Sequence, residues 1–308
     1  MYKNICFFNH WHNGDVFCSK QYIKELIRQM PFVNFQYAQK NTSKLLLDLN
    51  LQEVSLDTVP VACFNDRFAE LGETLYINTW IGGYLDLLAE LGHRHSNWIN
   101  LNKVWFSIFD VIEKKYNIQL IRKPSLLNYI HETEWSVYET KPVTEFIKNH
   151  NTIVLFCNGQ VNSNQSSAPD LQNIINIVAS LHPEITFVCT KKFDNTLNLD
   201  NLYFTDDIFS EVVGGDLNEI SYLSTKTKLI VGKNSGPYMY CHVSDNIFNN
   251  RNFLALSDHP TDGLAYNLDG FTCNYYHHCG NSEARIIKII ENILTDKMPN
   301  GNGKFQVV

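Results

Sequence analysis

The stretch that decides the fold is VGKNSGPYMY, residues 231–240. The apolar run 229–231 predicts a buried strand that stops at Gly232, and Pro237 then opens a helix. A strand that feeds a helix through a tight turn leaves several backbone N–H groups without partners, and the helix dipole adds positive charge there. Such a turn suits a phosphate or a carboxylate. The alternative is a plain strand-to-helix turn that binds nothing.

The rest of the chain alternates between strand-like and helix-like segments. Its 308 residues, 44% of them hydrophobic and 19% charged, are enough for about two domains with their own cores. Strands are expected at residues 3–10, 34–39, 73–83, 151–159, 185–190, 201–206, 227–232 and 252–258. Helices are expected at residues 16–30, 84–92, 100–116, 170–183, 216–226 and 282–296. This alternation predicts parallel sheets, and hence an α/β fold of two Rossmann-like domains that face a cleft.

The predicted domain junction lies within residues 123–150, where the periodicity is lost and prolines occur. We therefore expect an N-terminal Rossmann-like domain over residues 1–145 and a C-terminal one over residues 146–308. Open parallel sheets bind ligands at the carboxyl ends of their strands, so a ligand site is expected between the two domains.

Two loops follow predicted strands and carry polar side chains. The first, NHWHNGD at residues 9–15, supplies a carboxylate and imidazoles that could take a proton from an incoming hydroxyl. The alternative is that Asp15 caps the first helix. The loop has neither the dinucleotide fingerprint nor a P-loop. The second loop, residues 157–169, is rich in Asn, Gln and Ser, which suit a diphosphate or a sugar; the alternative is a solvated loop.

Residues 216–240, DLNEISYLSTKTKLIVGKNSGPYMY, resemble the heptosyltransferase-type pattern of glycosyltransferase family 9. In that pattern an Asp-Leu helix leads into a strand that ends near VG-x-[DN]-SGP. The Gly14-Asp15 pair and the helix after it also resemble that family. The family often has Asp where this chain has Asn234, and the Lys-Trp pair expected in the second loop is missing.

The resemblance implies a GT-B glycosyltransferase that inverts the sugar and needs neither a metal nor another cofactor. An Asp-x-Asp metal motif does not occur in the chain. Asp15 would be the catalytic base, with His10 and His12 in reserve. The donor, a nucleotide-diphospho-sugar, would be held by Asn158, Gly159, Gln160, Ser163, Asn234, Ser235 and Gly236. The acceptor, a glycan or glycoconjugate hydroxyl, would bind near Asn13, Asn78 and Trp80.

Composition limits the partners and the compartment. A net charge of −7 argues against a general nucleic-acid binder. Eight scattered cysteines without a C-x-x-C pair, and an N-terminus unlike a signal peptide, predict a cytoplasmic protein. The sequence lacks an apolar run long enough to span a membrane, while peripheral association with one stays open.

Two further interpretations remain open. The segment CNYYHHCG, residues 273–280, has two Cys and two His, but adjacent ligands rarely reach one tetrahedral zinc ion, so no metal site is expected. The alternatives to a transferase are a GT-B-like nucleotide-sugar epimerase or hydrolase, and a non-catalytic nucleotide-binding protein.

Overall fold

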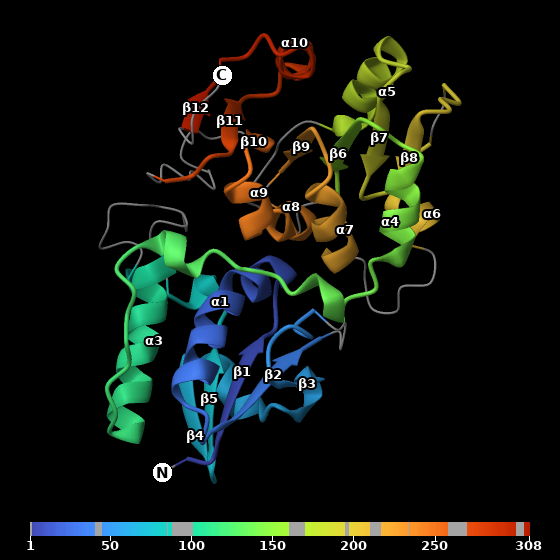
Figure 1. The fold of residues 1–308 in the computed structure, drawn as a ribbon. Coiled ribbons are helices and arrows are strands. Elements are labelled where there is room, and N and C mark those ends of the chain that lie inside the picture. The colour runs from blue at the N-terminus through green and yellow to red at the C-terminus, as the bar shows by residue number, and fades with distance from the viewer. Residues whose placement is uncertain are drawn as a thin grey trace. The chain divides into compact units, whose positions relative to one another are not determined.

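The computed structural model describes residues 2–40, 45–84, 86–87, 101–159, 170–194, 197–209, 217–233, 235–257, 270–299 and 305–308. The chain forms two compact units, Met1–His131 and Glu132–Val308 (Figure 1). The predicted junction at 145/146 falls inside helix α4 (Lys141–Lys148), which packs against α7 (Leu217–Ser224) of the second unit. Trp135 also belongs to that unit, because its indole N–H donates to the carboxylate of Asp245 over 3.2 Å.

The first unit is built on a five-stranded sheet with strand order β3-β2-β1-β5-β4. All neighbouring strands are parallel except the β4–β5 pair, which is antiparallel. Its strands and helices are β1 (Asn4–Asn9), α1 (Asn13–Gln29), β2 (Asn34–Gln39), β3 (Gln52–Ser55), β4 (Phe68–Leu71), β5 (Thr74–Asn78) and α3 (Leu101–Tyr116), with 3-10 helices η1 (Leu56–Thr58), η2 (Val61–Asn65), η3 (Ile81–Tyr84) and η5 (Leu126–Tyr129).

Alternation along β1 gives this sheet two apolar faces. Phe7 packs against Trp105 of α3, and that ring stacks on Tyr22 of α1 with centroids 5.1 Å apart. Phe8, which points to the other face, joins a buried cluster with Cys63 of η2. Buried on both faces, β1 can be apolar throughout, as a central parallel strand should be.

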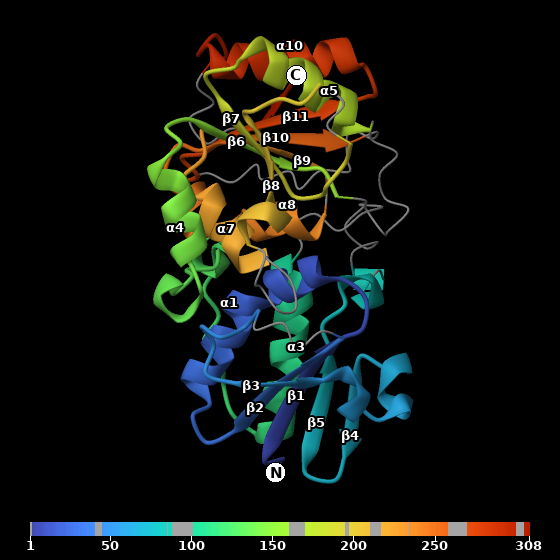
Figure 2. The same ribbon diagram turned by 90° about the vertical axis from the view of Figure 1, so that its right-hand side faces the viewer.

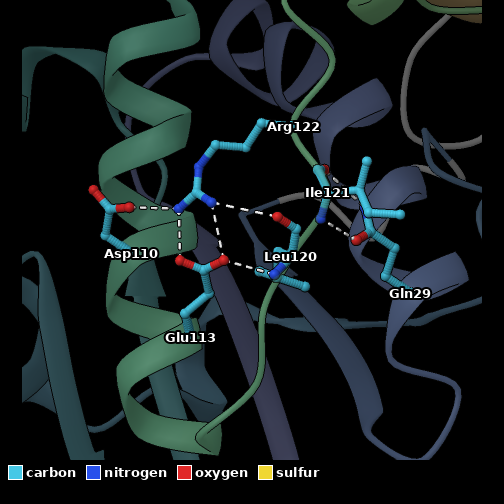
Figure 3. A network of polar contacts seen from close by, with 6 residues as sticks. All are labelled: Gln29, Asp110, Glu113, Leu120, Ile121 and Arg122. Atoms are coloured by element: carbon cyan, nitrogen blue, oxygen red, sulfur yellow. Dashed lines mark hydrogen bonds and ion pairs between the residues drawn. The ribbon is translucent and has the colours of Figure 1, made fainter.

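A polar network fastens the segment after α3 to the helices beside it (Figure 3). Arg122 donates to both carboxylate oxygens of Glu113 over 2.9 and 2.8 Å, and also bonds Asp110. Gln29 at the end of α1 bonds both backbone groups of Ile121 over 3.1 and 2.7 Å. These contacts hold the segment after α3 against α3 and the end of α1. They thereby fix the path of the chain toward the end of the first unit.

A buried ionic cluster holds the last residue of the first unit. The Lys20 ammonium lies 2.9 Å from Asp48 Oδ1, and Asp48 Oδ2 lies 2.6 Å from His131 Nε2, with all three side chains at most 1% exposed. Burial, followed by the nearby charge of Lys20, lowers the pKa of His131 to about 4. The imidazole is therefore neutral at physiological pH, and the ion pair proper is that of Lys20 with Asp48.

The second unit is built on a seven-stranded sheet, order β12-β11-β10-β9-β6-β7-β8, in which all neighbours are parallel. Helices α5 and α10 share one apolar layer on one face, and α7 and α8 pack together on the other (Figure 2). The remaining elements are η6 (Trp135–Val137), β6 (Ile153–Cys157), α5 (Leu171–Leu181), β7 (Thr186–Cys189), β8 (Leu202–Phe204), α6 (Thr205–Ile208), β9 (Leu229–Gly232), α8 (Gly236–Tyr240), α9 (Ser244–Ile247), β10 (Asn252–Ser257), β11 (Asn274–Cys279), α10 (Glu283–Leu294) and β12 (Phe305–Val307).

The expected α/β architecture is confirmed in both units, and Asp170 caps α5 by accepting from the N–H of Gln172 over 3.1 Å. All eight cysteines are free, and seven of them are buried. None of the helices in the described part of the chain is both long and apolar enough to cross a bilayer.

Candidate functional site

Each sheet has one point where the chain reverses its direction of travel across the strands, and the predicted loops lie there. In the first unit the reversal falls between β1 and β5, and in the second between β6 and β9. Ligands of open α/β sheets bind outside the carboxyl ends of the strands at such points. The loop before Asp15 follows β1, residues 79–84 follow β5, and the KNSGP turn follows β9. Topology therefore brings the sequence motifs of each unit to the edge that favours a ligand.

Asp15 lies in the first turn of α1 but does not cap it. The N-cap is His12, whose carbonyl accepts from the Asp15 N–H over 3.1 Å. The Asp15 carboxylate instead accepts over 3.4 Å from the backbone N–H of Ile81, the first residue of η3, which follows β5. Of the two interpretations of Asp15, the side-chain cap is excluded by this geometry. The carboxylate sits between the two strands at the reversal point.

The carboxyl of Asp15 is half-buried, and its pKa is strongly raised. Burial raises its pKa from 3.8 to about 7, although hydrogen bonds from Ile81 and Asn9 pull in the other direction. Burial, and then the charge of Asp15, raise the pKa of Cys18, which lies one turn along α1. The Tyr37 phenol, bonded to Thr79 over 2.7 Å, also feels the Asp15 charge. A carboxylate with a pKa near neutrality is suited to accept a proton from a hydroxyl.

His10 and His12 border the same site in different ways. Burial, followed by the positive charge of Lys40, lowers the pKa of both imidazoles, so both are neutral at pH 7. The His10 ring is enclosed by aromatic rings, with centroids 5.1 Å from Trp11 and 5.8 Å from Trp80. Its environment is that of a packing residue.

The three predicted acceptor residues have different surroundings. Asn78 is 5% exposed, and its side-chain oxygen accepts from the N–H of Trp80 over 3.0 Å. It therefore shapes the turn that holds Trp80. Asn13, the first residue of α1, and Trp80 are half-buried and reachable from solvent. Trp11, which sequence reasoning passed over within its own motif, lies beside Trp80 with centroids 5.5 Å apart.

In the second unit the site is the turn from β9 into α8. Position 232, the last residue of β9, needs a glycine because a Cβ there would lie 2.4 Å from the Tyr238 ring and 2.9 Å from the Cβ of Cys157. Ser235 is the N-cap of α8 and is 8% exposed, and its hydroxyl has no hydrogen-bond partner among the described residues. Gly236 opens α8. A buried hydroxyl that has no hydrogen-bond partner among the described residues, at the N-terminus of a helix, is a group that a ligand oxygen would satisfy.

Lys233 adds a positive charge to this turn and was not predicted. It is half-buried, burial lowers its pKa, and Asp170 opposes that shift. On the neighbouring strand, Asn158 bonds both backbone groups of Lys191 over 2.9 Å each, so its amide braces the ends of β6 and β7. Gly159 has open space around it. The other predicted donor residues, Gln160, Ser163 and Asn234, lie outside the described residues.

The Cys/His segment forms strand β11, not a metal loop. Side chains alternate along a strand, so His277 and His278 face opposite sides of the sheet. His277 bonds the hydroxyl of Ser257 over 2.7 Å, and His278 lies 2.9 Å from the carbonyl of Val308. Among the described residues, three or more His, Cys, Asp or Glu side chains nowhere gather in a way that could hold a metal ion.

Comparisons with known proteins give a fold. No family model matches the chain, and no curated protein matches its sequence. Among solved structures, E. coli heptosyltransferase WaaC with ADP-2-deoxy-2-fluoro heptose is similar over 96% of this chain and 100% of that chain, at 9% identity and a TM-score of 0.51. WaaC with ADP gives the same coverage at 8% identity and a TM-score of 0.53. A putative UDP-N-acetylglucosamine 2-epimerase from Listeria monocytogenes matches more weakly, at 9% identity and a TM-score of 0.44 over 96% of this chain and 89% of that one. The chain thus has the two-unit α/β fold of heptosyltransferases of the GT-B type.

Proposed function

We propose that the protein is an inverting glycosyltransferase that moves a sugar from a nucleotide-diphospho-sugar to a hydroxyl group of a glycan or glycoconjugate. The observation that carries the proposal is the position of Asp15 at the strand-order reversal of the first unit, where its half-buried carboxylate accepts from the Ile81 N–H over 3.4 Å and burial raises its pKa to about 7. The turn around Ser235, at the corresponding reversal of the second unit, supports a site for the donor diphosphate.

The chemistry needs a base, an electrophile and a stabilised leaving group. In the proposed step Asp15 takes the proton of the acceptor hydroxyl, whose oxygen attacks the anomeric carbon of the donor sugar. The bond from that carbon to the diphosphate oxygen breaks, and the bond electrons leave with the nucleoside diphosphate. Ser235, Gly236 and Lys233 would hold that negative charge through preorganised donors, which is how an active site stabilises a developing anion.

The acceptor is assigned to the edge of the first unit around Asp15, with Asn13 and Trp80 in contact and Asn78 acting through the position of Trp80. Because the donor charge would be held by N–H, hydroxyl and ammonium groups, we expect transfer without an added metal and without another cofactor.

Two other activities fit the same fold. An epimerase or hydrolase would consume the donor when no acceptor is present, and a non-catalytic binding protein would bind nucleotide but leave the sugar in place. Release of nucleoside diphosphate that depends on an added acceptor separates the transferase from both.

The test is release of nucleoside diphosphate from a panel of nucleotide sugars, with and without acceptor glycans and with and without EDTA. We expect acceptor-dependent release that EDTA does not reduce, and a loss of at least about 100-fold in Asp15→Asn, since general bases contribute about 10²–10⁴-fold. The exposed carboxylate of Asp66 supplies the control, because Asp66→Asn should retain full activity. Full activity in Asp15→Asn would reject Asp15 as the base.

A further inference from the structure

Two matching turns bring two tryptophans together at the edge of the first sheet. Asn9 ends β1, and its side-chain oxygen accepts from the N–H of Trp11 over 2.8 Å. Asn78 ends the neighbouring strand β5, and its side-chain oxygen accepts from the N–H of Trp80 over 3.0 Å. Both asparagines are buried, and each bends its chain two residues before a tryptophan. As a result the two indole rings lie side by side, with centroids 5.5 Å apart and planes at 39°.

Aromatic side chains support the two indole rings. His10 packs against both, with centroids 5.1 Å from Trp11 and 5.8 Å from Trp80, and Phe64 packs edge-to-face on His10 with centroids 5.5 Å apart. Trp11 nevertheless remains 53% exposed, which is costly for so large an apolar ring. A fixed, exposed aromatic surface beside a polar site is a common mark of a binding surface.

A glycine is needed for this arrangement. A Cβ on Gly82 would lie 2.4 Å from Cζ2 of the Trp80 ring, whereas a Cβ on Gly83 would come no closer to it than 3.8 Å. The Trp80 ring therefore lies directly over Gly82, and the adjacent glycine offers a matched comparison one residue away.

We propose that Trp11 and Trp80 form a stacking platform for a pyranose ring, so that the acceptor is a saccharide and not a lipid or peptide hydroxyl. The proposal rests on the proposed function, in which Asp15 beside the platform takes the acceptor proton. A pyranose has one face of C–H groups, which packs on an indole, and a rim of hydroxyls, which needs polar partners. Polar partners for that rim are His12, whose ring centroid lies 6.3 Å from that of Trp11, and Lys40, whose charge acts on His10 and His12. An acyl chain would find these polar groups unfavourable.

The experiment measures sugar binding without donor, so that it does not depend on turnover. Saturation-transfer NMR with a panel of methyl pyranosides and simple disaccharides, together with tryptophan fluorescence titration, reports contact between the sugar C–H face and the indoles. We expect at least one glycoside to bind the wild type, and Trp11→Ala to weaken that binding about tenfold or more. Trp11→Phe should restore most of it.

Two variants make the test specific for the platform. Gly82→Ala should displace the Trp80 ring and weaken glycoside binding, while Gly83→Ala should leave it within twofold of wild type. In the transfer assay the Trp11→Ala variant should raise KM for the acceptor and leave KM for the donor unchanged. Equal glycoside binding by wild type and Trp11→Ala would overturn the platform, as would binding of detergent micelles in preference to every sugar. If the protein binds a glycoside through Trp11 but turns over none of the nucleotide sugars in the transfer assay, the proposed function is wrong and the platform proposal still holds.

Discussion

Replacing Asp15 by Asn should make the folded protein more stable at pH 8 while it removes activity. Asn keeps the size of the side chain and can still accept from the Ile81 N–H, but it carries no charge to desolvate. In the wild type, burial raises the pKa of Asp15 from 3.8 to about 7. Between these values the carboxyl ionises in the unfolded chain and stays protonated in the folded one. Stability therefore falls as the pH rises from about 4 to 7, and this loss is absent in the variant.

The size of the effect follows from the shift. About three pKa units at 1.36 kcal/mol each give an upper limit of about 4 kcal/mol. Asp15 is partly exposed, and water lowers the cost of its charge. We therefore expect Asp15→Asn to gain about 2 kcal/mol at pH 8. The gain is measured relative to the difference between variant and wild type at pH 4, where the folded carboxyl is protonated, the unfolded one has only begun to ionise, and the penalty is below about 1 kcal/mol.

The assay is urea unfolding followed by tryptophan fluorescence between pH 4 and 8. Four of the five tryptophans belong to the first unit, so fluorescence mainly follows the unit that contains Asp15. The difference between variant and wild type must be used, because His131 has the opposite slope in an overlapping range: its lowered pKa makes stability fall as the pH drops from about 6.5 to 4. A flat difference curve would refute the reasoning, since the Asp15 carboxyl would then be ordinarily hydrated. Asp66→Asn, at an exposed site, should change stability by less than about 0.5 kcal/mol.

Other parts of the chain give further predictions. Asp48→Asn should cost about 3–5 kcal/mol in urea unfolding, because the ammonium of Lys20 is left buried without its counter-charge; a cost below about 1 kcal/mol would contradict this. Gly232→Ala should destabilise the second unit by about 1–3 kcal/mol, because the new Cβ meets a buried tyrosine ring, whereas Gly159→Ala should be neutral; equal melting temperatures for the two variants would argue against it. Lys233→Met should weaken nucleoside diphosphate binding about tenfold in calorimetry, by loss of one charge-assisted contact; unchanged affinity and unchanged salt dependence would remove the lysine from the donor site.

The sequence predicted the fold well where the apolar residues of a segment recur with a strong period and are buried in the structure. The expected segments at residues 34–39 and 100–116 match β2 and α3 almost residue for residue. It failed where an element is short or lacks a clear apolar pattern, as in β3 and the antiparallel strand β4. Strand β11 was not predicted because its histidines and cysteine suggested ligands, although the two histidines are buried in a parallel sheet.

The candidate site was likewise only partly predictable from the sequence. Asp15 could be placed after the first strand from its local motif, but its contact with the N–H of Ile81 joins distant parts of the chain and could not be predicted from that motif. The pairing of Trp11 with Trp80 also needs the β1–β5 register, in which Phe8 lies opposite Asn78. The local sequence pattern of each strand cannot predict that register, because β1 and β5 are far apart in the sequence.

Calorimetric binding of a panel of nucleoside diphosphates tests the central claim most directly. The account predicts that one of them binds the wild type, that EDTA leaves its affinity unchanged, and that Ser235→Val, which replaces the buried hydroxyl by two methyl groups that cannot hydrogen-bond, weakens it about tenfold or more. A variant that folds as the wild type does, by its urea midpoint, keeps this comparison sound. If no nucleoside diphosphate binds, or if Ser235→Val binds as tightly as the wild type, the turn after β9 is not the donor site and the proposed glycosyl transfer loses its basis.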